Sequence, residues 1–292
     1  MTEKEKLMYD ILARISGVDA PIVFKGALIT KMILAEHGFT DVQRMTKDID
    51  ANWIGTPPTM SDLAGTIYQA LGDLKNQFSV EATREYGEGK SAGLTLRDKA
   101  TGDKVISMDI DIKPSAGNRI YYFGEASIKG VLPSEILADK ISSMSSDAVY
   151  KHRAKDIVDV YSLSHCVQVN IKDVCDACER ANREIQSFDA FYNRRSDIEH
   201  AYNKLKGIEG KPEFAQVYTY LSKFIQPFAE RDFTNKIWNP QCTSWQEQHQ
   251  KQRGGVYVSR ETLKKSSKEL AEKRSKAPER SAPKKKRDTS LE

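Results

Sequence analysis

The spacing of apolar residues changes near residue 130, and this change limits the folds that the chain can adopt. Before it, alternation with a period of two predicts strands over residues 78–85, 93–97 and 105–112, separated by turn-rich stretches. From Pro133 onward the spacing is almost entirely that of helices. We therefore expect an α/β or α+β head followed by a helical lobe, with a ligand-binding groove between them.

Helices are also expected within the head. Apolar side chains recur at helical spacing over residues 4–15, 28–38 and 61–74, and Ser61 is the expected N-cap of the third helix. A strand is expected over residues 46–54, where a Gly-Thr-Pro-Pro sequence follows and stops it. Helices and strands are therefore mixed along this part of the chain.

The second half of the chain, from Pro133 onward, is expected to consist of a helical lobe followed by a tail. Its strongest apolar stripe begins at Phe214, and Pro227 is expected to end or kink that helix. Tryptophans in this half are expected in the core of the lobe. We predict three regions: a head over residues 1–130, a helical lobe over 131–255 and a basic, largely disordered tail over 256–292.

The net charge of +4 is distributed unevenly along the 292 residues. Residues 260–292 contain twelve Lys or Arg against six Asp or Glu, so the preceding part of the chain is mildly acidic. Prolines and few apolar residues predict disorder from about Ser275 onward. Residues 283–287 match a nuclear-localisation pattern, but a solubilising tail is the favoured interpretation and contact with nucleic acid the alternative.

The chain has few features of an exported or membrane protein. No apolar run approaches the roughly 18–20 residues needed to cross a bilayer, and the N-terminus lacks the apolar core of a secretory signal. Four cysteines do not make a disulfide scaffold, so a cytoplasmic location is expected. Cys175 and Cys178 are three residues apart in a helical pattern, and we expect them to pack inward rather than to bind zinc.

Two pairs of aspartates stand on predicted strands. Asp48 and Asp50 project from the same face of one strand, about 6.5 Å apart, which suits a pair of acids that hold hard cations such as Mg²⁺. Asp109 and Asp111 alternate with apolar residues on a second strand. If the two strands are neighbours, three carboxylates converge. The alternative for each strand alone is a solvent-exposed face of an antiparallel sheet.

Basic and small residues could complete a nucleotide site. Gly26 lies between an apolar run and a helix, and such a turn offers free backbone N–H groups to a triphosphate. Lys140 lies about two turns into a predicted helix, where it is either solvated or able to contact phosphate oxygens. Asp156 and Asp159 lie one helical turn apart, and an exposed surface with a Lys155–Asp159 ion pair is the simplest interpretation.

The order of these motifs over residues 21–165 resembles the AbiEii/AbiGii toxin-type nucleotidyltransferases of the DNA-polymerase-β-like superfamily. The fold that this implies is a polymerase-β-like head with a mixed sheet and a helical C-terminal lobe. The motifs, in chain order, are Lys25-Gly26-Ala27-Leu28, Arg44-x-Thr46-x-Asp48-Ile49-Asp50, Asp109, Leu137-Ala138-Asp139-Lys140 and Arg153-x-Lys155-Asp156-Ile157-x-Asp159.

The resemblance implies metal ligands. Asp48 and Asp50 would hold Mg²⁺, and Asp109 is the favoured third ligand, with Asp111 the alternative. Lys140 would contact the triphosphate.

The resemblance also implies nucleotide-binding residues. Asp156 would complete the site, orienting Lys140 or an acceptor hydroxyl. The nucleotide and its loop would be positioned by Lys25, Gly26, Ala27, Arg44 and Thr46. Ala27 departs from the family pattern, which often has a hydroxyl or a second glycine after the first glycine, so one phosphate-binding group is missing.

The implied activity is the Mg²⁺-dependent transfer of an NMP from an NTP to an acceptor, with loss of pyrophosphate. A tRNA 3′ end is the leading acceptor, and the protein would act as the toxin of a toxin–antitoxin or abortive-infection system with a cognate antitoxin. One alternative keeps the chemistry but modifies a protein or a small molecule. A second is a noncatalytic binding protein on the same fold.

Overall fold

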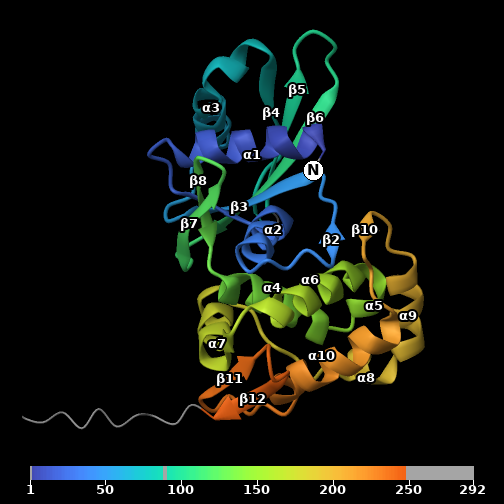
Figure 1. Cartoon of the computed structure of the whole chain (residues 1–292). Helices are drawn as coiled ribbons and strands as arrows, with labels where there is room; N and C mark the ends of the chain where they lie inside the picture. The colour runs from blue at the N-terminus through green and yellow to red at the C-terminus, as the bar shows by residue number, and fades with distance from the viewer. Residues whose placement is uncertain (1, 88–90, 248–292) are drawn as a thin grey trace, which may run out of the picture. The chain divides into compact units, whose positions relative to one another are not determined.

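A computed structural model of the chain describes residues 2–87 and 91–247 (Figure 1). The helices are α1 (Glu3–Ser16), α2 (Gly26–Glu36), α3 (Met60–Ala70), the 3₁₀ helix η1 (Gly72–Asn76), α4 (Pro133–Ser145), α5 (Val149–His152), α6 (Ala154–Cys166), α7 (Ile171–Arg180), α8 (Asp189–Asn193), α9 (Arg195–Asn203) and α10 (Phe214–Ala229). The strands are β1 (Ile22–Lys25), β2 (Gln43–Arg44), β3 (Asp48–Ile54), β4 (Phe78–Arg84), β5 (Ala92–Asp98), β6 (Lys104–Lys113), β7 (Asn118–Phe123), β8 (Ala126–Val131), β9 (Val169–Asn170), β10 (Ile208–Glu209), β11 (Lys236–Asn239) and β12 (Ser244–Glu247).

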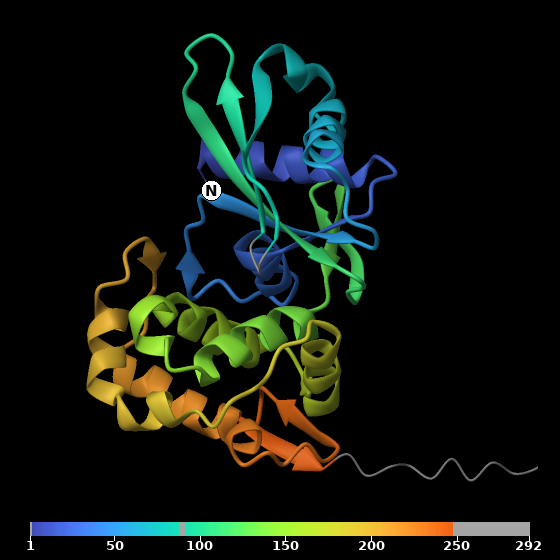
Figure 2. The ribbon, with the colours of Figure 1, turned by 180° about the vertical axis from the view of Figure 1, so that it is seen from behind.

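The head is built on a seven-stranded mixed sheet with the order β4-β5-β6-β3-β1-β8-β7. The pairs β3/β6 and β1/β8 are parallel, and the other neighbours are antiparallel. Helices α1 and α3 pack against this sheet and each other, and α2 packs on β1 and β3 (Figures 1 and 2). The predicted α+β class with a mixed sheet is confirmed.

Alternation along β6 explains why this segment is a central strand. Ile106, Met108 and Ile110 are fully buried on one face, whereas Asp109 and Asp111 on the other face are only half-buried. Because side chains alternate, the acids share the face that carries the polar residues of the neighbouring strand β3. The strands predicted over residues 78–85, 93–97 and 105–112 are confirmed to within a residue or two at each end.

The caps of two helices follow different rules. Helix α1 begins with a capping box in which the Thr2 hydroxyl accepts from the Glu5 backbone N–H and the Glu5 carboxylate accepts from the Thr2 backbone N–H. The prediction that Ser61 is the N-cap of α3 was wrong. Thr59 caps this helix, because its hydroxyl accepts from the Asp62 N–H, and Ser61 lies inside the first turn.

The helical half is less uniform than its apolar pattern predicts. Helix α10 ends at Ala229, two residues after Pro227, so the predicted end of this helix is confirmed to within two residues. Beyond it, β11 pairs with both β9 and β12 in a small antiparallel sheet that the helical spacing did not predict. Trp238 of β11 is fully buried, so its predicted place in the core is confirmed.

The described residues, 2–87 and 91–247, belong to one compact unit, in which the strands of the large sheet end at Val131 and helix α4 begins at Pro133. The division at residue 130 into separate domains stays a prediction. The predicted tail over 256–292 lies outside the described residues, as does the basic run at 283–287. Within residues 2–87 and 91–247, no helix combines the length and apolar character needed to cross a bilayer.

Candidate functional site

A polar cavity of about 370 Å³ lies where the central strands face the helical half. Its walls come from segments more than a hundred residues apart in the sequence. The head contributes Lys25, Gly26, Ala27, Arg44, Asp50, Asn52, Asp109, Asp111 and Lys113, among others. The helical half contributes Glu135, Asp139, Lys140, Ser143, Arg153, Lys155, Asp156 and Arg183. Most of the residues predicted for the site therefore meet in one cavity.

The parallel register of β3 and β6 brings the predicted acids together. Asp50 lies directly opposite Asp109, and the next pair on the same face is Asn52 opposite Asp111. Asp48 is on the same face of β3 but is exposed, pairs with Ser107 and does not line the cavity. The structure thus brings Asp50 and Asp109 into one place and leaves Asp48 at the solvent-exposed start of the strand.

Gly26 is required by the packing of Asp50. The backbone of Gly26 has φ +69°, a left-handed conformation that favours glycine. A Cβ atom at this position would lie 2.8 Å from Cγ of Asp50, so any side chain would displace the carboxylate. A close approach between this turn and the acid on β3 is therefore built into the fold.

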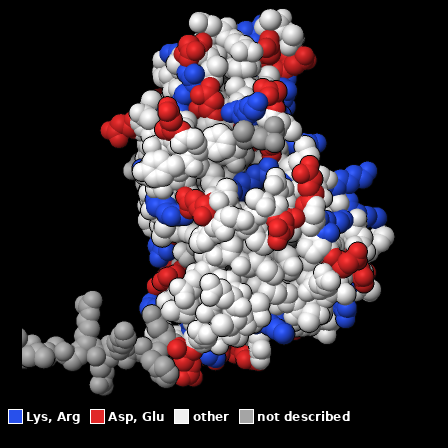
Figure 3. All heavy atoms as spheres, in the orientation of Figure 1, with Lys and Arg blue, Asp and Glu red and all other residues white. Residues whose placement is uncertain are grey.

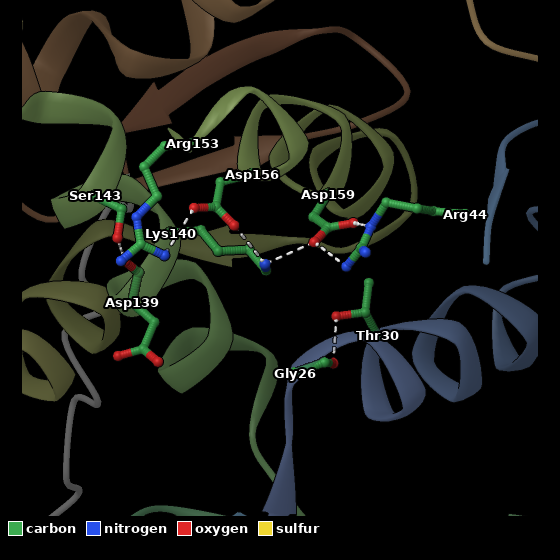
Figure 4. Close-up of polar contacts among 9 residues, drawn as sticks. All are labelled: Gly26, Thr30, Arg44, Asp139, Lys140, Ser143, Arg153, Asp156 and Asp159. Carbon is green, nitrogen blue, oxygen red and sulfur yellow. Dashed lines mark hydrogen bonds and ion pairs between the residues drawn. The ribbon is translucent and has the colours of Figure 1, made fainter. Parts of the chain in front are cut away.

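The turn at Gly26 also opens the N-terminus of α2 toward the cavity. The N-cap residue Lys25 provides no side-chain cap, because its ammonium group pairs with Asp111 at 2.5 Å. Thr30 donates its hydroxyl to the Gly26 carbonyl at 2.9 Å, one turn further on (Figure 4). An uncapped helix N-terminus presents backbone N–H groups and partial positive charge, which suits an anion.

The surroundings of Asp50 on the sheet side of the cavity disfavour the ionised form of its carboxyl group. Burial raises the pKa of the Asp50 carboxyl, and the neighbouring charge of Asp109 raises it further. The cations Lys25, Lys140 and Lys155 act in the opposite direction but do not restore the ordinary value. Additional positive charge at this point would stabilise the ionised carboxylate.

The carboxylates on the sheet have the chemistry of a hard-cation site. No three Asp, Glu, His or Cys side chains within residues 2–87 and 91–247 are already gathered as metal ligands. Asp109 pairs with Arg84 at 2.5 Å, but both side chains are 44% exposed, so this ion pair can open at little cost. The carboxylates of Asp50 and Asp109 have the oxygen atoms that a divalent cation prefers, whereas Asp48 lies on the same face of β3 but outside the cavity. Asp109 is placed better than Asp111, which is held by Lys25.

The helical side holds a buried network of alternating charges. Lys140 Nζ lies 3.0 Å from Asp156 Oδ1 and 2.6 Å from Asp159 Oδ2. Arg44 donates from Nε and Nη2 to the two oxygens of Asp159, each at 2.9 Å (Figure 4). This bidentate pair ties the β2 strand of the head to α6 of the helical half.

The charges of this network are mutually stabilised. Burial alone favours neutral Lys140, but Asp159 and Asp156 outweigh it and raise the pKa of the ammonium group. Burial would likewise raise the pKa of Asp159, but Lys140 and Arg44 hold it below its usual value. The charged forms of Lys140, Arg44 and Asp159 are therefore favoured, and each has partners within the fold.

Asp159 was the main residue that the sequence interpretation missed. An exposed Lys155–Asp159 ion pair was expected, and this was wrong: Asp159 is 4% exposed and binds Lys140 and Arg44 instead. The sequence signal was the position of Asp159 between Val158 and Val160, since an acid buried among apolar residues needs buried cations as partners.

Two exposed cations line the cavity, and one residue predicted for the site does not. Lys155, which was not among the predicted site residues, is exposed and lines the cavity, and its charge acts on Asp50. Arg153 lies 3.7 Å from Asp156 and lines the same wall. Thr46 does not line the cavity; its hydroxyl donates to the Asp48 carbonyl at 3.3 Å and so positions the loop before β3.

The cysteine pair on α7 lies outside this site. Cys178 is buried, as expected, and Cys175 is half-buried. Burial raises the pKa of Cys178 to about 12 and that of Cys175 to about 11. Both thiols are therefore protonated at neutral pH and unreactive as nucleophiles.

Comparison with known proteins gives one extended match. The family model described as "Nucleotidyl transferase AbiEii toxin, Type IV TA system" matches residues 10–231. No curated protein matches the sequence.

Two solved structures have similar folds. One is an antigenic nucleotidyltransferase-like protein from Paracoccidioides brasiliensis (16% identity, 69% of this chain and 93% of that chain covered, TM-score 0.42). The other is MenT4, a nucleotidyltransferase toxin from Mycobacterium tuberculosis H37Rv (15% identity, 79% and 81% covered, TM-score 0.47). At these identities and scores, neither likeness bears on function.

Proposed function

The chain belongs to the AbiEii family of type IV toxin nucleotidyltransferases, and from this premise we propose that it transfers an NMP from an NTP to a tRNA 3′ end. The reaction would depend on Mg²⁺ and would release pyrophosphate. A cognate antitoxin would restrain it in the cytoplasm, and abortive infection is the proposed context. The observation that carries the proposal is the register that sets Asp50 opposite Asp109, directly against Gly26 at the start of α2.

The backbone around Gly26 would bind the triphosphate. The uncapped first turn of α2 offers N–H donors, and the absence of a side chain at Gly26 lets a phosphate approach both the helix and Asp50. Ala27 lines the cavity without a hydroxyl, so binding here depends on backbone groups.

Cations on the helical wall would complete the triphosphate site. Lys155 and Arg153 are exposed and face the cavity, so they can reach phosphate oxygens. Lys140 is held between Asp156 and Asp159 and would act at shorter range, through its charge and its remaining N–H donors. Asp156 positions Lys140 and, at 3.7 Å, the Arg153 guanidinium.

Asp48, Asp50 and Asp109 would hold Mg²⁺, which would neutralise the triphosphate and activate the acceptor hydroxyl. The chain itself supplies the orientation. Asp50 is fixed by its contact with Gly26, and Asp109 is fixed by its register with β3. Opening of the exposed Arg84–Asp109 pair would free the second carboxylate.

The tRNA acceptor is supported by the family resemblance and by the excess of basic residues over 260–292. On the face shown in Figure 3, acidic and basic side chains are interspersed, and much of the lower part is uncharged. That face of the described chain carries no continuous basic surface. We propose that the cavity receives the tRNA 3′ end.

The test is a screen with the four α-labelled NTPs, each incubated with total RNA and with protein lysate in the presence of Mg²⁺. The expected result is label on small RNA, lost in Asp48→Ala and Asp50→Ala proteins that remain folded. Omission of the divalent cation should abolish transfer. Label on protein alone would replace tRNA with a protein acceptor, and equal labelling by the Asp50→Ala protein would overturn the assignment of the site.

A further inference from the structure

Two buried side-chain atoms within the described residues lack a hydrogen-bond partner, and both belong to the walls of this cavity. They are Oδ1 of Asn52 and Nε of Arg183. Nε of Arg183 lies 2.6 Å from Asp139 Oδ1 in an ion pair, but its N–H is not aligned for a hydrogen bond. Buried polar atoms are nearly always bonded, so a cavity that leaves an acceptor and a donor unpaired is shaped for a ligand.

Asn52 marks the direction in which the cavity continues from the phosphate site. It is 6% exposed and stands two residues after Asp50 on the same face of β3, about 6.5 Å further along the strand. The cavity follows this strand pair past Asp111 to Lys113, which lies opposite Ile54. In the other direction it stops at Asp50, because Asp48 does not line it.

The chemistry of Asn52 Oδ1 excludes a phosphate as its partner. A carboxamide oxygen only accepts, so the ligand group must carry a donor hydrogen. The acids nearby, Asp111, Glu135 and Asp139, are each paired with a cation of the fold, so they leave little uncompensated charge at this end of the cavity. The end of the cavity beyond Asp50 is therefore suited to the uncharged nucleoside part of an NTP.

Position along the strand decides which part of the nucleoside meets Asn52. In an NTP the ribose is joined directly to the α-phosphate, and its hydroxyls are the first donors beyond it. Asn52 is the first polar residue beyond Asp50 on the shared face of β3. In such an arrangement the base, which is attached further from the phosphate, would lie toward Glu135 and Arg183 on the opposite wall.

We propose that Asn52 Oδ1 accepts a hydrogen bond from a ribose hydroxyl of the NTP and so selects ribonucleotides over nucleotides that lack this hydroxyl. This rests on the proposed function, because it takes the α-phosphate to lie at Asp50. Removing a ribose hydroxyl leaves the buried acceptor unpaired in the complex, and such a loss weakens binding by about tenfold or more.

The same reasoning makes the Asn52→Ala protein a usable test. In the free protein, Asn52 Oδ1 already lacks a partner, so its removal deletes no hydrogen bond and should leave thermal stability unchanged or higher. Asn76→Ala is the matched control, because Asn76 is exposed on η1 and does not line the cavity.

The experiment measures binding of a non-hydrolysable α,β-methylene NTP and its 2′-deoxy and 3′-deoxy forms by calorimetry, with Mg²⁺ present. The wild-type and Asn76→Ala proteins should bind the parent about tenfold or more tightly than one deoxy form. Asn52→Ala should bind the parent more weakly, by a similar factor, and should no longer distinguish the two.

Two results would overturn the proposal: equal binding of all three nucleotides by the wild-type protein, or unchanged discrimination in the Asn52→Ala protein. Failure of the proposed function looks different. In that case the wild-type protein neither binds the parent NTP nor transfers label from it. If only the role of Asn52 is wrong, the wild-type protein still binds the parent NTP and transfers label from it.

Discussion

The two walls of the cavity handle buried polar groups in opposite ways. On the helical wall, Lys140, Asp156, Asp159 and Arg44 satisfy one another through ion pairs of 2.6 to 3.0 Å. On the sheet wall, the pKa of Asp50 is raised by burial, and Asn52 has an oxygen without a partner. These four residues are paired without a ligand, whereas Asn52 on the sheet wall and Nε of Arg183, elsewhere on the helical half, have hydrogen-bonding groups without a partner.

This difference separates residues that hold the site together from residues that receive the substrate. A network whose members are all paired adds rigidity, and removing one member leaves the others buried and uncompensated. Buried polar or charged groups that lack a partner lower the stability of the free protein. A ligand that pairs with them restores that stability when it binds. Substitutions on the two walls should therefore change stability in opposite directions.

The largest expected effect is on the helical wall. Asp159→Asn leaves the charges of Lys140 and Arg44 without their shared partner, so the free energy of unfolding should fall by about 3–5 kcal/mol at pH 7. Urea denaturation measures this. Asp176→Asn, which removes the exposed i,i+4 pair with Lys172, is the control and should leave the free energy of unfolding nearly unchanged.

The effect of Asp159 should depend on pH with a known sign. Because the folded protein holds the pKa of Asp159 below its usual value, its stabilisation is present above the unfolded pKa of about 3.9. It is lost as the pH falls below that value toward the folded pKa. The difference between wild type and Asp159→Asn should shrink in this acid range, and a difference that stays constant would contradict the ion-pair explanation.

The next largest effect is on the sheet wall and separates activity from stability. Asp50→Asn should lower NMP transfer by at least about a hundredfold, since a charged group at the reacting centre is lost. Its free energy of unfolding should rise at pH 7, because the raised pKa means that ionised Asp50 destabilises the folded state. As the pH falls below the unfolded pKa of about 3.9, the carboxyl becomes neutral in both the folded and the unfolded states, and the stabilities of the two proteins should converge. A lower free energy of unfolding for the Asp50→Asn protein at pH 7 would contradict the proposed difference between the two walls.

A substitution at Gly26 should have a smaller effect, which arises from backbone strain and from displacement of Asp50. Gly26→Ala should cost about 1–3 kcal/mol of stability through backbone strain and should also lower transfer, because the new methyl displaces Asp50. Gly38→Ala is a close control: Gly38 has φ +68°, but a Cβ there would touch nothing within 4 Å. Equal losses of activity in the two variants would show that the contact with Asp50 is unimportant.

The smallest expected effect concerns Lys155, the exposed cation on the helical wall. Lys155→Ala should raise the KM for the NTP by about tenfold through loss of one phosphate contact and should leave the urea midpoint unchanged. Lys223→Ala, on the exposed side of α10, is the control. An unchanged KM together with lower stability would make Lys155 part of the structural network instead.

Local patterns predicted the elements well where one physical rule dominated. The alternation from Ile106 to Asp111 specified β6 and its acidic face, because a strand buried on one side has no other way to place these residues. Prediction failed where rules competed. Ser61 and Thr59 are both good N-caps, and only the backbone chose Thr59, whereas β11 and β9 pair across residues that no local spacing relates.

The sequence by itself determined which residues share a face: Asp48, Asp50 and Asn52 on one strand, Asp109 and Asp111 on another. It also determined the glycine at the start of α2. Only the tertiary structure decided that Asp50 stands opposite Asp109, because strand register depends on how whole faces pack. Likewise, the bond between Arg44 and Asp159 joins residues 115 positions apart, and burial turned an apparent surface charge into a structural one.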